Sequence, residues 1–439
     1  MKSEVFGMAR EINLGILGLG TVGTGVAKVL LEEGDLLTKR TGMRFRLKSA
    51  ADLDWSRDRG VDFNGVHTTT DINEILNDPE IEIIVETIGG YEPAFTYIMQ
   101  ALANHKHVVT ANKALIATKG KELFMQAKKN GVDLLFEASV GGGIPIIKGL
   151  REGLIANKFL SLYGIINGTS NYILTKMHQD GIDFSQALKE AQMKGFAEAD
   201  PTLDVSGGDA AHKLTILASL ASGGMVDFNS IPVEGITALT TMDINFAKNF
   251  GYVIKLLAIC RFFGEELDLR VHPTLIPKEH LLAAVNNELN AVFVTGNYVG
   301  DTMFYGPGAG QCPTASAIVS DIVDLSKDLL LKNGERFSNR TVNPEHKAAL
   351  LPLEKISNRF YLRIFTLDKP GILSSIAGVL GQYGISISSV IQLETHGEQE
   401  FVPIVLLTHK APEKAMNKAL AEITTFDFVR SDILRLRLF

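Results

Sequence analysis

The chain has 439 residues, of which 46% are hydrophobic and 21% are charged, and this composition is typical of a folded globular protein rather than a disordered or fibrous one. At about 150 residues per domain, the length predicts about three domains. The 43 basic and 50 acidic side chains give a net charge of −7, which argues against nucleic acid and against an anionic membrane surface as partners.

Cysteine usage and hydropathy both favour a cytoplasmic location. The two cysteines, Cys260 and Cys312, stand in neither a CxxC pair nor a zinc motif, which fits a reducing compartment. No apolar run reaches the ~18 residues that a membrane helix needs. The early apolar run, Ile12 to Leu19, leads into glycines rather than into a signal-peptidase site. We therefore expect a cytoplasmic protein without a membrane segment.

Buried strands and amphipathic helices alternate over residues 1–140. Strands are predicted at Ile12–Gly18, Arg44–Leu53, Ile81–Thr87, His107–Thr110 and Val132–Glu137, and helices at Val22–Glu33, Pro93–Asn104 and Gly120–Asn130. Such alternation predicts an α/β domain of the Rossmann type, which is a doubly wound parallel sheet.

The pattern then changes to glycine-rich turns, longer helices and strands such as Val292–Thr295. We expect a second, α+β domain over residues 141–310, and a helix over about 311–331 that returns to the first domain. A polar stretch from Lys332 to His346 contains Asn-Gly, Ser-Asn and Asn-Pro pairs, which are typical of a linker. We assign residues 332–354 to this linker.

The last unit, residues 355–439, has the predicted element order βαββαβ. Its elements are a strand at Phe360–Phe365, a helix at Gly371–Gln382, strands at Ile385–Thr395 and Phe401–Thr408, a helix at Pro412–Ile423 and a strand at Phe426–Leu438. This order is that of the ferredoxin-like split unit.

A glycine-rich motif, Gly18-Leu19-Gly20-Thr21-Val22-Gly23, follows the first predicted strand and opens the first predicted helix. In this position glycines let the backbone approach a pyrophosphate at the helix N-terminus. The motif therefore indicates a dinucleotide cofactor, and the alternative is a tight turn without a ligand. Asp52, at the end of the second strand, would favour NAD by repelling a 2′-phosphate. Arg57 and Arg59 could instead hold that phosphate, so these residues leave NAD and NADP open.

Two further strands end in polar residues at the same edge of the predicted sheet. Thr87 ends one strand, and Lys113 follows the next. Ligands of such sheets bind at the carboxyl ends of the strands. A lysine there suits an anionic or carbonyl substrate, although lysine is more often a solvated surface residue.

Acidic residues concentrate around glycines and prolines in the segment Ala191–Lys213. Helical spacing of apolar residues follows, which puts Asp209 and Lys213 at i and i+4 on one helical face. The carboxylate can then orient the lysine. The alternative is a helix that begins near Asp209 and carries an ordinary surface ion pair.

The segment Ala191–Lys213 resembles the long signature of the homoserine dehydrogenases. The resemblance covers nearly all of the first two domains, in the segments Gly18–Gly23, Thr110–Lys113, Glu137–Ile146, Ile165–Leu174 and Tyr305–Ser316. It implies NAD(P)-dependent interconversion of L-homoserine and L-aspartate 4-semialdehyde, a step of threonine, methionine and isoleucine biosynthesis. Many relatives carry an arginine for the 2′-phosphate where Ala50 and Ala51 stand here, which argues against a strict NADP preference.

The resemblance also implies roles for individual residues. Lys213 is the expected proton donor, because an aldehyde that accepts a hydride becomes an alkoxide, which a lysine ammonium can stabilise and protonate. Lys113 would orient the substrate and polarise its oxygen. Glu198 and Asp209 would hold the ammonium and hydroxyl ends of the amino acid. The expected cofactor contacts are Gly18, Leu19, Gly20, Thr21, Val22, Gly23, Thr87, Lys113, Gly195 and Gly310.

The loop Glu137–Ile144 is similar to the monovalent-cation loop of this family. The expected ligands of a sodium ion are the carbonyls of Glu137, Val140, Gly142 and Ile144. Oxygen-only ligation suits a hard cation. The alternative is a glycine-rich hinge between domains, and the two interpretations are compatible.

A polar turn is expected at Asn167–Asn171, before a helix. Ser170 is predicted to cap that helix. We therefore expect this turn to have a structural role rather than a direct part in the chemistry.

The C-terminal unit resembles an ACT domain in strand order and in the turn residues of Leu367–Leu373 and Gly384–Gln392. Such domains commonly bind amino acids between paired copies. In this family the resemblance implies feedback inhibition by L-threonine, with the ligand near Asp368–Gly371 and Gln392. The alternative is a module that only supports oligomerisation. We expect a homodimer or a homotetramer.

Two other functions are weighed against this one. One is a non-catalytic amino-acid sensor that keeps a nucleotide-binding scaffold, and the other is a dehydrogenase of another small hydroxy or amino acid. A degenerate sensor is expected to lose Lys113, Glu198, Asp209 or Lys213, and the chain keeps all four. The residues therefore favour an enzyme.

Overall fold

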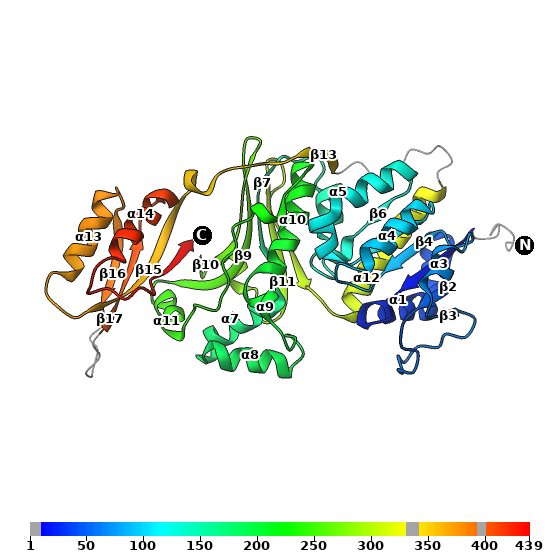
Figure 1. The fold of residues 1–439 in the computed structure, drawn as a ribbon, viewed down its shortest axis with the longest axis horizontal. Coiled ribbons are helices and arrows are strands. Elements are labelled where there is room, and N and C mark those ends of the chain that lie inside the picture. The colour runs from blue at the N-terminus through cyan, green and yellow to red at the C-terminus, as the bar shows by residue number, and fades with distance from the viewer. Residues whose placement is uncertain (1–9, 331–341, 393–400) are drawn as a thin grey trace, which may run out of the picture. The chain divides into compact units, whose positions relative to one another are not determined.

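The computed structural model describes residues 10–330, 342–392 and 401–439, and the chain divides into two compact units (Figure 1). The first unit comprises the described residues up to Phe159 together with His212–Ser230 and Asn290–Ala348. The second unit comprises Leu160–Ala211, Ile231–Leu289 and Ala349–Phe439. No helix in the described part of the chain is long and apolar enough to cross a membrane.

The first unit contains a six-stranded parallel sheet with the order β3-β2-β1-β4-β5-β6. Its strands are β1 (Arg10–Leu17), β2 (Met43–Ala51), β3 (His67–Thr69), β4 (Ile83–Glu86), β5 (His107–Thr110) and β6 (Leu134–Leu135). The predicted Rossmann-type sheet is confirmed. Because the strand order reverses between β1 and β4, the carboxyl ends of these two strands are where such sheets bind ligands.

Six helices accompany this sheet. They are α1 (Thr21–Glu32), α2 (Gly34–Thr41), α3 (Ile72–Leu76), α4 (Ala94–Ala103), α5 (Lys113–Asn130) and α12 (Gln311–Leu330). Helices α1 and α12 share one apolar core with β1 and β2, which includes Val26 and Ile318. Helix α5 begins at Lys113 rather than at the predicted Gly120, because the side chain of Asn112 caps it.

Shorter elements complete the first unit. They are η1 (Glu137–Ser139), α6 (Ile146–Lys148), η2 (Gly149–Gly153), β8 (Gly224–Met225), η3 (Phe228–Ser230), β11 (Leu289–Gly296), β12 (Gly300–Pro307) and β13 (Asn343–Lys347). Strand β13 lies within the segment predicted to be a linker, and it pairs with β8 in parallel. Residues 331–341 of the chain lie outside the described residues. Helix α10 (Gly208–Ser222) runs across the boundary between the sequence ranges of the two units.

The second unit is built on a mixed sheet with the order β7-β9-β10-β19-β15-β17-β16. Its strands are β7 (Phe159–Ile165), β9 (Tyr252–Phe263), β10 (Glu266–Pro277), β15 (Ser357–Leu367), β16 (Ile387–Gln392), β17 (Phe401–Thr408) and β19 (Leu434–Leu438), with β14 (Ala349–Leu350) beside β10 and β18 (Ala411–Pro412) beside β15. Its helices are α7 (Gly168–Asp180), α8 (Phe184–Met193), α9 (Thr202–Val205), α11 (Thr241–Asn249), α13 (Ile372–Gln382) and α14 (Glu413–Ile423), with short turns η4 (Leu281–Ala284) and η6 (Leu353–Lys355).

The C-terminal part of the second unit has the predicted βαββαβ order, with its strands arranged β19-β15-β17-β16. The ferredoxin-like prediction is confirmed. Alternate residues of β15, such as Phe360 and Leu362, share a core with Ile376 of α13 and Met416 of α14. Because side chains alternate along a strand, both helices cover the same face of this sheet.

The last strand of the chain joins two parts of the second unit. Strand β19 pairs antiparallel with β15 and parallel with β10. It was predicted over Phe426–Leu438 but begins at Leu434, because the residues before it form no continuous ladder with β15 and pair with it at the isolated bridge between Val429 and Thr366. The C-terminal module therefore continues the sheet that contains β9 and β10.

Candidate active site

The glycine-rich loop between β1 and α1 is shaped by close backbone contacts. A Cβ on Gly23 would lie 2.0 Å from the carbonyl oxygen of Gly18, so only glycine fits there. A Cβ on Gly20 would meet nothing within 4 Å, and no side chain caps the N-terminus of α1. An uncapped helix N-terminus beside open space is the arrangement that accepts a diphosphate, so this loop fits a dinucleotide.

The turns after β4 and β5 hold the glycine-rich loop in place. Thr87 Oγ1 donates a hydrogen bond to the carbonyl of Gly18 (2.6 Å). The fully buried Glu86 accepts the N–H of Ile88 (2.7 Å) and the hydroxyl of Thr110 (2.5 Å), which ties the ends of the two strands together. Sequence reasoning missed Glu86, although an acid at the end of a buried strand is a signal for such a role.

Lys113 is the first residue of α5 and is partly buried. It follows Asn112, whose side chain caps the helix and donates to the carbonyl of Gly90 after β4 (2.8 Å). The structure thus places Lys113 at the same edge of the sheet as Thr87. This is the edge at which a Rossmann-type sheet binds its cofactor and substrate.

Asp52 closes the glycine-rich loop from the side of β2. Its carboxylate accepts the N–H of Leu19 (2.6 Å) and lies 3.1 Å from the guanidinium of Arg59. Arg59 also donates to the carbonyl of Leu19 and stacks over Trp55, and its side chain is only 5% exposed. Arg57 is exposed. One of the two candidate phosphate ligands is therefore engaged by the protein itself.

Gly310 directly precedes α12 and has a φ of +118°, a conformation that favours glycine. The next residue, Gln311, packs on α1, since a Cβ on Gly25 would lie 2.8 Å from its side chain. The loop that ends at Gly310 therefore runs up to the first helix of the cofactor motif.

The loop after β6 is buried and rich in main-chain oxygens. The four carbonyl groups that are expected to bind the cation belong to the buried residues Glu137, Val140, Gly142 and Ile144. The Glu137 carboxylate is engaged elsewhere, because it accepts the N–H groups of Ile147 (2.9 Å) and Lys148 (2.7 Å). Among the described residues, no three His, Cys, Asp or Glu side chains could together hold a metal ion. Carbonyl donors alone fit a hard monovalent cation.

A buried pair of acids supports this loop. Asp321 of α12 accepts the main-chain N–H of Glu137 (2.7 Å). Burial, and then the negative charge of Glu137, raise the pKa of Asp321 to about 8. Burial also raises the pKa of Glu137, against the opposing effect of the N–H groups that its carboxylate accepts. Burial and the nearby charge of Glu137 therefore favour the protonated form of Asp321.

Helix α10 carries two of the predicted active-site residues one turn apart. Asp209 is 3% exposed and Lys213 is 8% exposed. Charged side chains are seldom buried unless they are paired or functional. Both groups therefore lie below the surface, unlike an ordinary solvent-exposed ion pair.

Asn167 joins two acids of the signature segment. Its side-chain amide donates to Asp204 (2.7 Å) and to Asp209 (2.8 Å). Its carbonyl oxygen accepts the N–H of Ser170 (2.8 Å), so that Asn167 caps α7. The prediction that Ser170 caps this helix is wrong, because Ser170 already lies in the first turn, and its hydroxyl donates to the carbonyl of Asp204 (2.9 Å).

Gly195 and Glu198 lie on an exposed turn after α8. Gly195 has a φ of +74°, and the carbonyl of Glu198 accepts a hydrogen bond from Gln192 (3.2 Å). The structure therefore brings Asn167 and Asp204 together with Asp209, whereas it leaves the Glu198 side chain in solvent. Sequence reasoning missed the two former residues as partners, although both lie in segments that carried the resemblance.

Known proteins resemble the chain along nearly its whole length. The family models "Homoserine dehydrogenase, NAD binding domain", "Homoserine dehydrogenase" and "ACT domain" match residues 18–137, 145–323 and 360–424. The homoserine dehydrogenase of Pseudomonas aeruginosa is 43% identical over 430 residues, which cover 98% of this chain and 99% of that protein. The chain belongs to the homoserine dehydrogenase family.

Other members of the family agree with this assignment. The homoserine dehydrogenase of Bacillus subtilis is 42% identical over 422 residues, or 96% of each protein. A crystal structure of a homoserine dehydrogenase from Thiobacillus denitrificans matches with a TM-score of 0.92 and 46% identity over 98% of each chain. The enzyme is thus an NAD(P)-dependent oxidoreductase with a C-terminal ACT domain. The prediction of an enzyme is confirmed over that of a non-catalytic sensor.

Proposed function

We propose that the enzyme interconverts L-homoserine and L-aspartate 4-semialdehyde, with Lys213 as the group that gives and takes the proton. The observation that carries this proposal is the buried cluster of the signature segment. Asn167 holds Asp204 and Asp209 there, and Lys213 follows Asp209 by one helical turn.

Hydride and proton travel separately in this reaction. Bound NAD(P) supplies or accepts the hydride. In the reducing direction the aldehyde carbon gains a C–H bond, and its oxygen becomes an alkoxide that takes a proton from the Lys213 ammonium. In the oxidising direction the neutral amine of Lys213 removes the hydroxyl proton. The burial of Lys213 keeps this proton transfer away from bulk water.

The charges around the substrate match those of a zwitterionic amino acid. As the resemblance implies, we assign Asp209 to one end of the amino acid and Lys113 to its reacting oxygen. Glu198, whose side chain is exposed on the turn after α8, is the second carboxylate that the resemblance assigns to the substrate. The amide of Asn167 fixes the Asp209 carboxylate before substrate binds, so little reorganisation is needed.

The contacts of Asp52 support NAD⁺ as the preferred cofactor. A 2′-phosphate would meet the charge of this carboxylate, which already accepts the N–H of Leu19. The guanidinium of Arg59 is already engaged by Asp52 and by main-chain carbonyls, so few of its N–H groups are left to bind such a phosphate. A homoserine dehydrogenase from a hyperthermophilic archaeon, solved in complex with NADPH, matches 72% of this chain with a TM-score of 0.60 and 25% identity. That similarity supports an NAD(P) site and does not by itself favour either cofactor.

A sodium ion would be held by the carbonyls of Glu137, Val140, Gly142 and Ile144. Its positive charge would fix this buried loop in one conformation. A Cβ on Gly142 would lie 2.6 Å from the carbonyl oxygen of Gly308, so the loop also braces the segment that leads to Gly310. The ion would thereby support the cofactor site without touching the reacting atoms.

The ACT domain supports regulation by L-threonine near Asp368–Gly371 and Gln392. Gly371 has a φ of +91° and precedes α13, whose N-terminus has no side-chain cap. This position suits the carboxylate of an amino acid. We place the enzyme in the cytoplasm as a homodimer or homotetramer, since ACT domains bind amino acids between paired copies.

Steady-state reduction of NAD⁺ and NADP⁺ by the purified enzyme tests the proposal. L-homoserine is the substrate, L-serine is the control, and each reaction is run with sodium and with choline as the cation, with and without L-threonine. We expect homoserine-dependent reduction that is faster with NAD⁺, stimulated by sodium and inhibited by L-threonine. A folded enzyme that reduces neither cofactor with L-homoserine would overturn the proposed reaction.

A further inference from the structure

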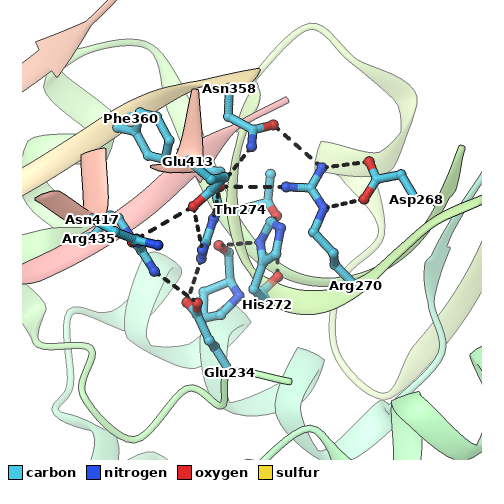
Figure 2. Close-up of polar contacts among 12 residues, drawn as sticks. Glu234, Asp268, Arg270, His272, Thr274, Asn358, Phe360, Glu413, Asn417 and Arg435 are labelled. Atoms are coloured by element: carbon cyan, nitrogen blue, oxygen red, sulfur yellow. Dashed lines mark hydrogen bonds and ion pairs between the residues drawn. The ribbon is translucent and has the colours of Figure 1, made fainter. Parts of the chain in front are cut away.

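A network of mostly buried charges lies where β10 meets the C-terminal module (Figure 2). The acids of this network are Glu234, Asp268 and Glu413, and its bases are Arg270, Arg435 and Arg437. Arg270 on β10 pairs with Asp268 (2.8 Å) and lies 3.8 Å from Glu413. Sequence patterns did not indicate the network, because its members come from distant parts of the chain.

Glu413, the first residue of α14, lies at the centre of the network and is fully buried. It accepts hydrogen bonds from Asn358 (2.8 Å) and from Arg437 (2.8 Å). Burial alone would raise the pKa of this carboxyl, but the hydrogen bond from Arg437 and the charges of Arg437, Arg435 and Arg270 hold it below its usual value. Glu413 is therefore ionised at neutral pH and depends on its arginine partners.

Arg437 connects this network to the catalytic domain. The side chain of Arg437 also donates to Glu234 (2.5 Å), and that of Arg435 lies 3.4 Å from the same carboxylate. Both arginines are on β19, which is paired with β15 on one side and with β10 on the other. Glu234 is therefore held by a strand that is fixed at both edges.

Glu234 belongs to a short segment, residues 231–236, which we call the strap. The main chain of the strap links two elements. The N–H of Glu234 donates to the carbonyl of Val271 on β10 (2.8 Å), and the N–H of Ile236 donates to the carbonyl of Val205 at the end of α9 (2.9 Å). The strap therefore links β10 of the mixed sheet to the signature segment, Ala191–Lys213.

The strap packs directly against the main chain that carries the acid cluster. A Cβ on Gly235 would lie 2.3 Å from the carbonyl oxygen of Val205, so no side chain fits between the two. Asp204 immediately precedes this contact, and its carboxylate shares the amide of Asn167 with that of Asp209. A displacement of the strap would therefore move the backbone that places both carboxylates.

We propose that Glu234 is a positioning residue through which the ACT domain sets the geometry of the substrate-binding acids. The proposal rests on the proposed function only in assigning Asp209 to the substrate. The route runs from Arg435 and Arg437 on β19 to Glu234 and the strap, and then to the main chain before Asp209. All of these residues lie in the second unit, whereas the glycine-rich loop lies in the first. A change in the ACT sheet is therefore transmitted to the affinity for L-homoserine rather than to that for the cofactor.

A purely structural role of Glu234 leads to a different result. Removing one partner of an ion pair destabilises a protein, so in that case loss of the charge would lower only the unfolding midpoint, or would change all kinetic constants together. Glu234→Gln keeps the side-chain volume, and the residue is 40% exposed at its side chain, so the variant is expected to fold. Glu265→Gln is the matched control, because it removes the same charge from an exposed turn between β9 and β10.

A double-mutant cycle tests the route from the ACT strand. Glu234→Gln, Arg435→Gln and the double variant are compared with the wild-type enzyme and the control. The measurements are kcat and KM for L-homoserine, the Kd of NAD⁺ by calorimetry, and hydrogen exchange of the peptide that covers residues 202–209. The exchange readout does not depend on turnover.

We expect each single variant to raise the KM for L-homoserine roughly 5-fold or more, the lower end of typical couplings between sites. The double variant should be no worse than the more affected single variant, exchange over residues 202–209 should be faster, and the Kd of NAD⁺ should not change. Wild-type KM and exchange in folded variants would overturn the proposal, as would parallel changes in KM, kcat and the Kd of NAD⁺. If the wild-type enzyme does not oxidise L-homoserine, the proposed function fails, and the exchange readout still decides the coupling.

Discussion

Substitution by alanine should lower the stability of the enzyme at Gly23, whereas at Gly20 it should lower the affinity for NAD⁺. In Gly23→Ala, the added methyl group would lie 2.0 Å from the carbonyl oxygen of Gly18 and 2.6 Å from Thr87 Oγ1. Carbon and oxygen atoms normally stay about 3.3 Å apart, so backbone must move by more than ~1 Å. In Gly20→Ala, the methyl group meets nothing within 4 Å, and the φ of −66° suits alanine.

The expected magnitudes follow from these contacts. Overpacking against backbone costs about 3 kcal/mol, and the hydrogen bond from Thr87 to Gly18 adds about 1 kcal/mol if it breaks. For a domain of this size, the loss lowers the unfolding midpoint by roughly 10 °C. Gly20→Ala should change stability by less than about 0.5 kcal/mol. It should nevertheless weaken NAD⁺ binding at least ~10-fold, because its methyl group occupies the space that the diphosphate needs.

Calorimetry provides both readouts, as the unfolding midpoint without cofactor and the Kd of NAD⁺. Wild-type NAD⁺ affinity in Gly20→Ala would refute the reasoning, because it would show that the diphosphate does not bind at this loop. A wild-type midpoint in Gly23→Ala would equally contradict the close approach of Gly18 and Gly23.

Three further predictions concern the cofactor, the substrate acids and a buried lysine. Asp52→Asn should raise the ratio of kcat/KM for NADP⁺ to kcat/KM for NAD⁺ about 10-fold, as measured by steady-state kinetics. An unchanged ratio would show that Asp52 does not select the cofactor. Asn167→Ser keeps a side-chain oxygen that can cap α7 but loses the hydrogen bonds to Asp204 and Asp209. The KM for L-homoserine should therefore rise about 10-fold while the unfolding midpoint falls little. An unchanged KM would contradict the positioning role. Burial lowers the pKa of Lys255, which is 1% exposed, to about 7. Between that pKa and 10.5 the unfolded chain holds a proton that the folded chain lacks, so urea unfolding should show a free energy that rises with pH over this window, and Lys255→Met should remove that rise. An identical pH dependence in the variant would show that Lys255 is charged in the folded enzyme.

Local patterns were enough to predict the Rossmann sheet and the loop at Gly18–Gly23. About 20 neighbouring positions contain all three signals, which are a run of apolar residues, a glycine-rich turn and a helical period. The ACT module was predictable for the same reason, since its elements follow one another directly. Element ends were less accurate, because the start of α5 depends on the side-chain cap by Asn112.

The contacts between distant segments were not predictable from local patterns. Nothing near Asn167 indicates that its amide lies between Asp204 and Asp209, because the turn before α7 must first be brought against α9 and α10. The pairing of β19 with β10 joins residues that are far apart in sequence, and Arg437 and Glu234 meet only because of it. The order of strands in a sheet is a property of the packed fold, which periodicity in a single strand does not encode.

The role of Lys213 as the proton-transfer group is the central claim, and one comparison tests it most directly. The kcat for L-homoserine oxidation and the Kd of NAD⁺ are measured for the wild-type enzyme and for Lys213→Ala under the same conditions. The account predicts that kcat falls about 10²-fold or more, the usual scale for losing a general acid or base, while the Kd of NAD⁺ stays close to the wild-type value. Near wild-type turnover in Lys213→Ala, or a loss of NAD⁺ binding that accompanies the loss of turnover, would contradict it.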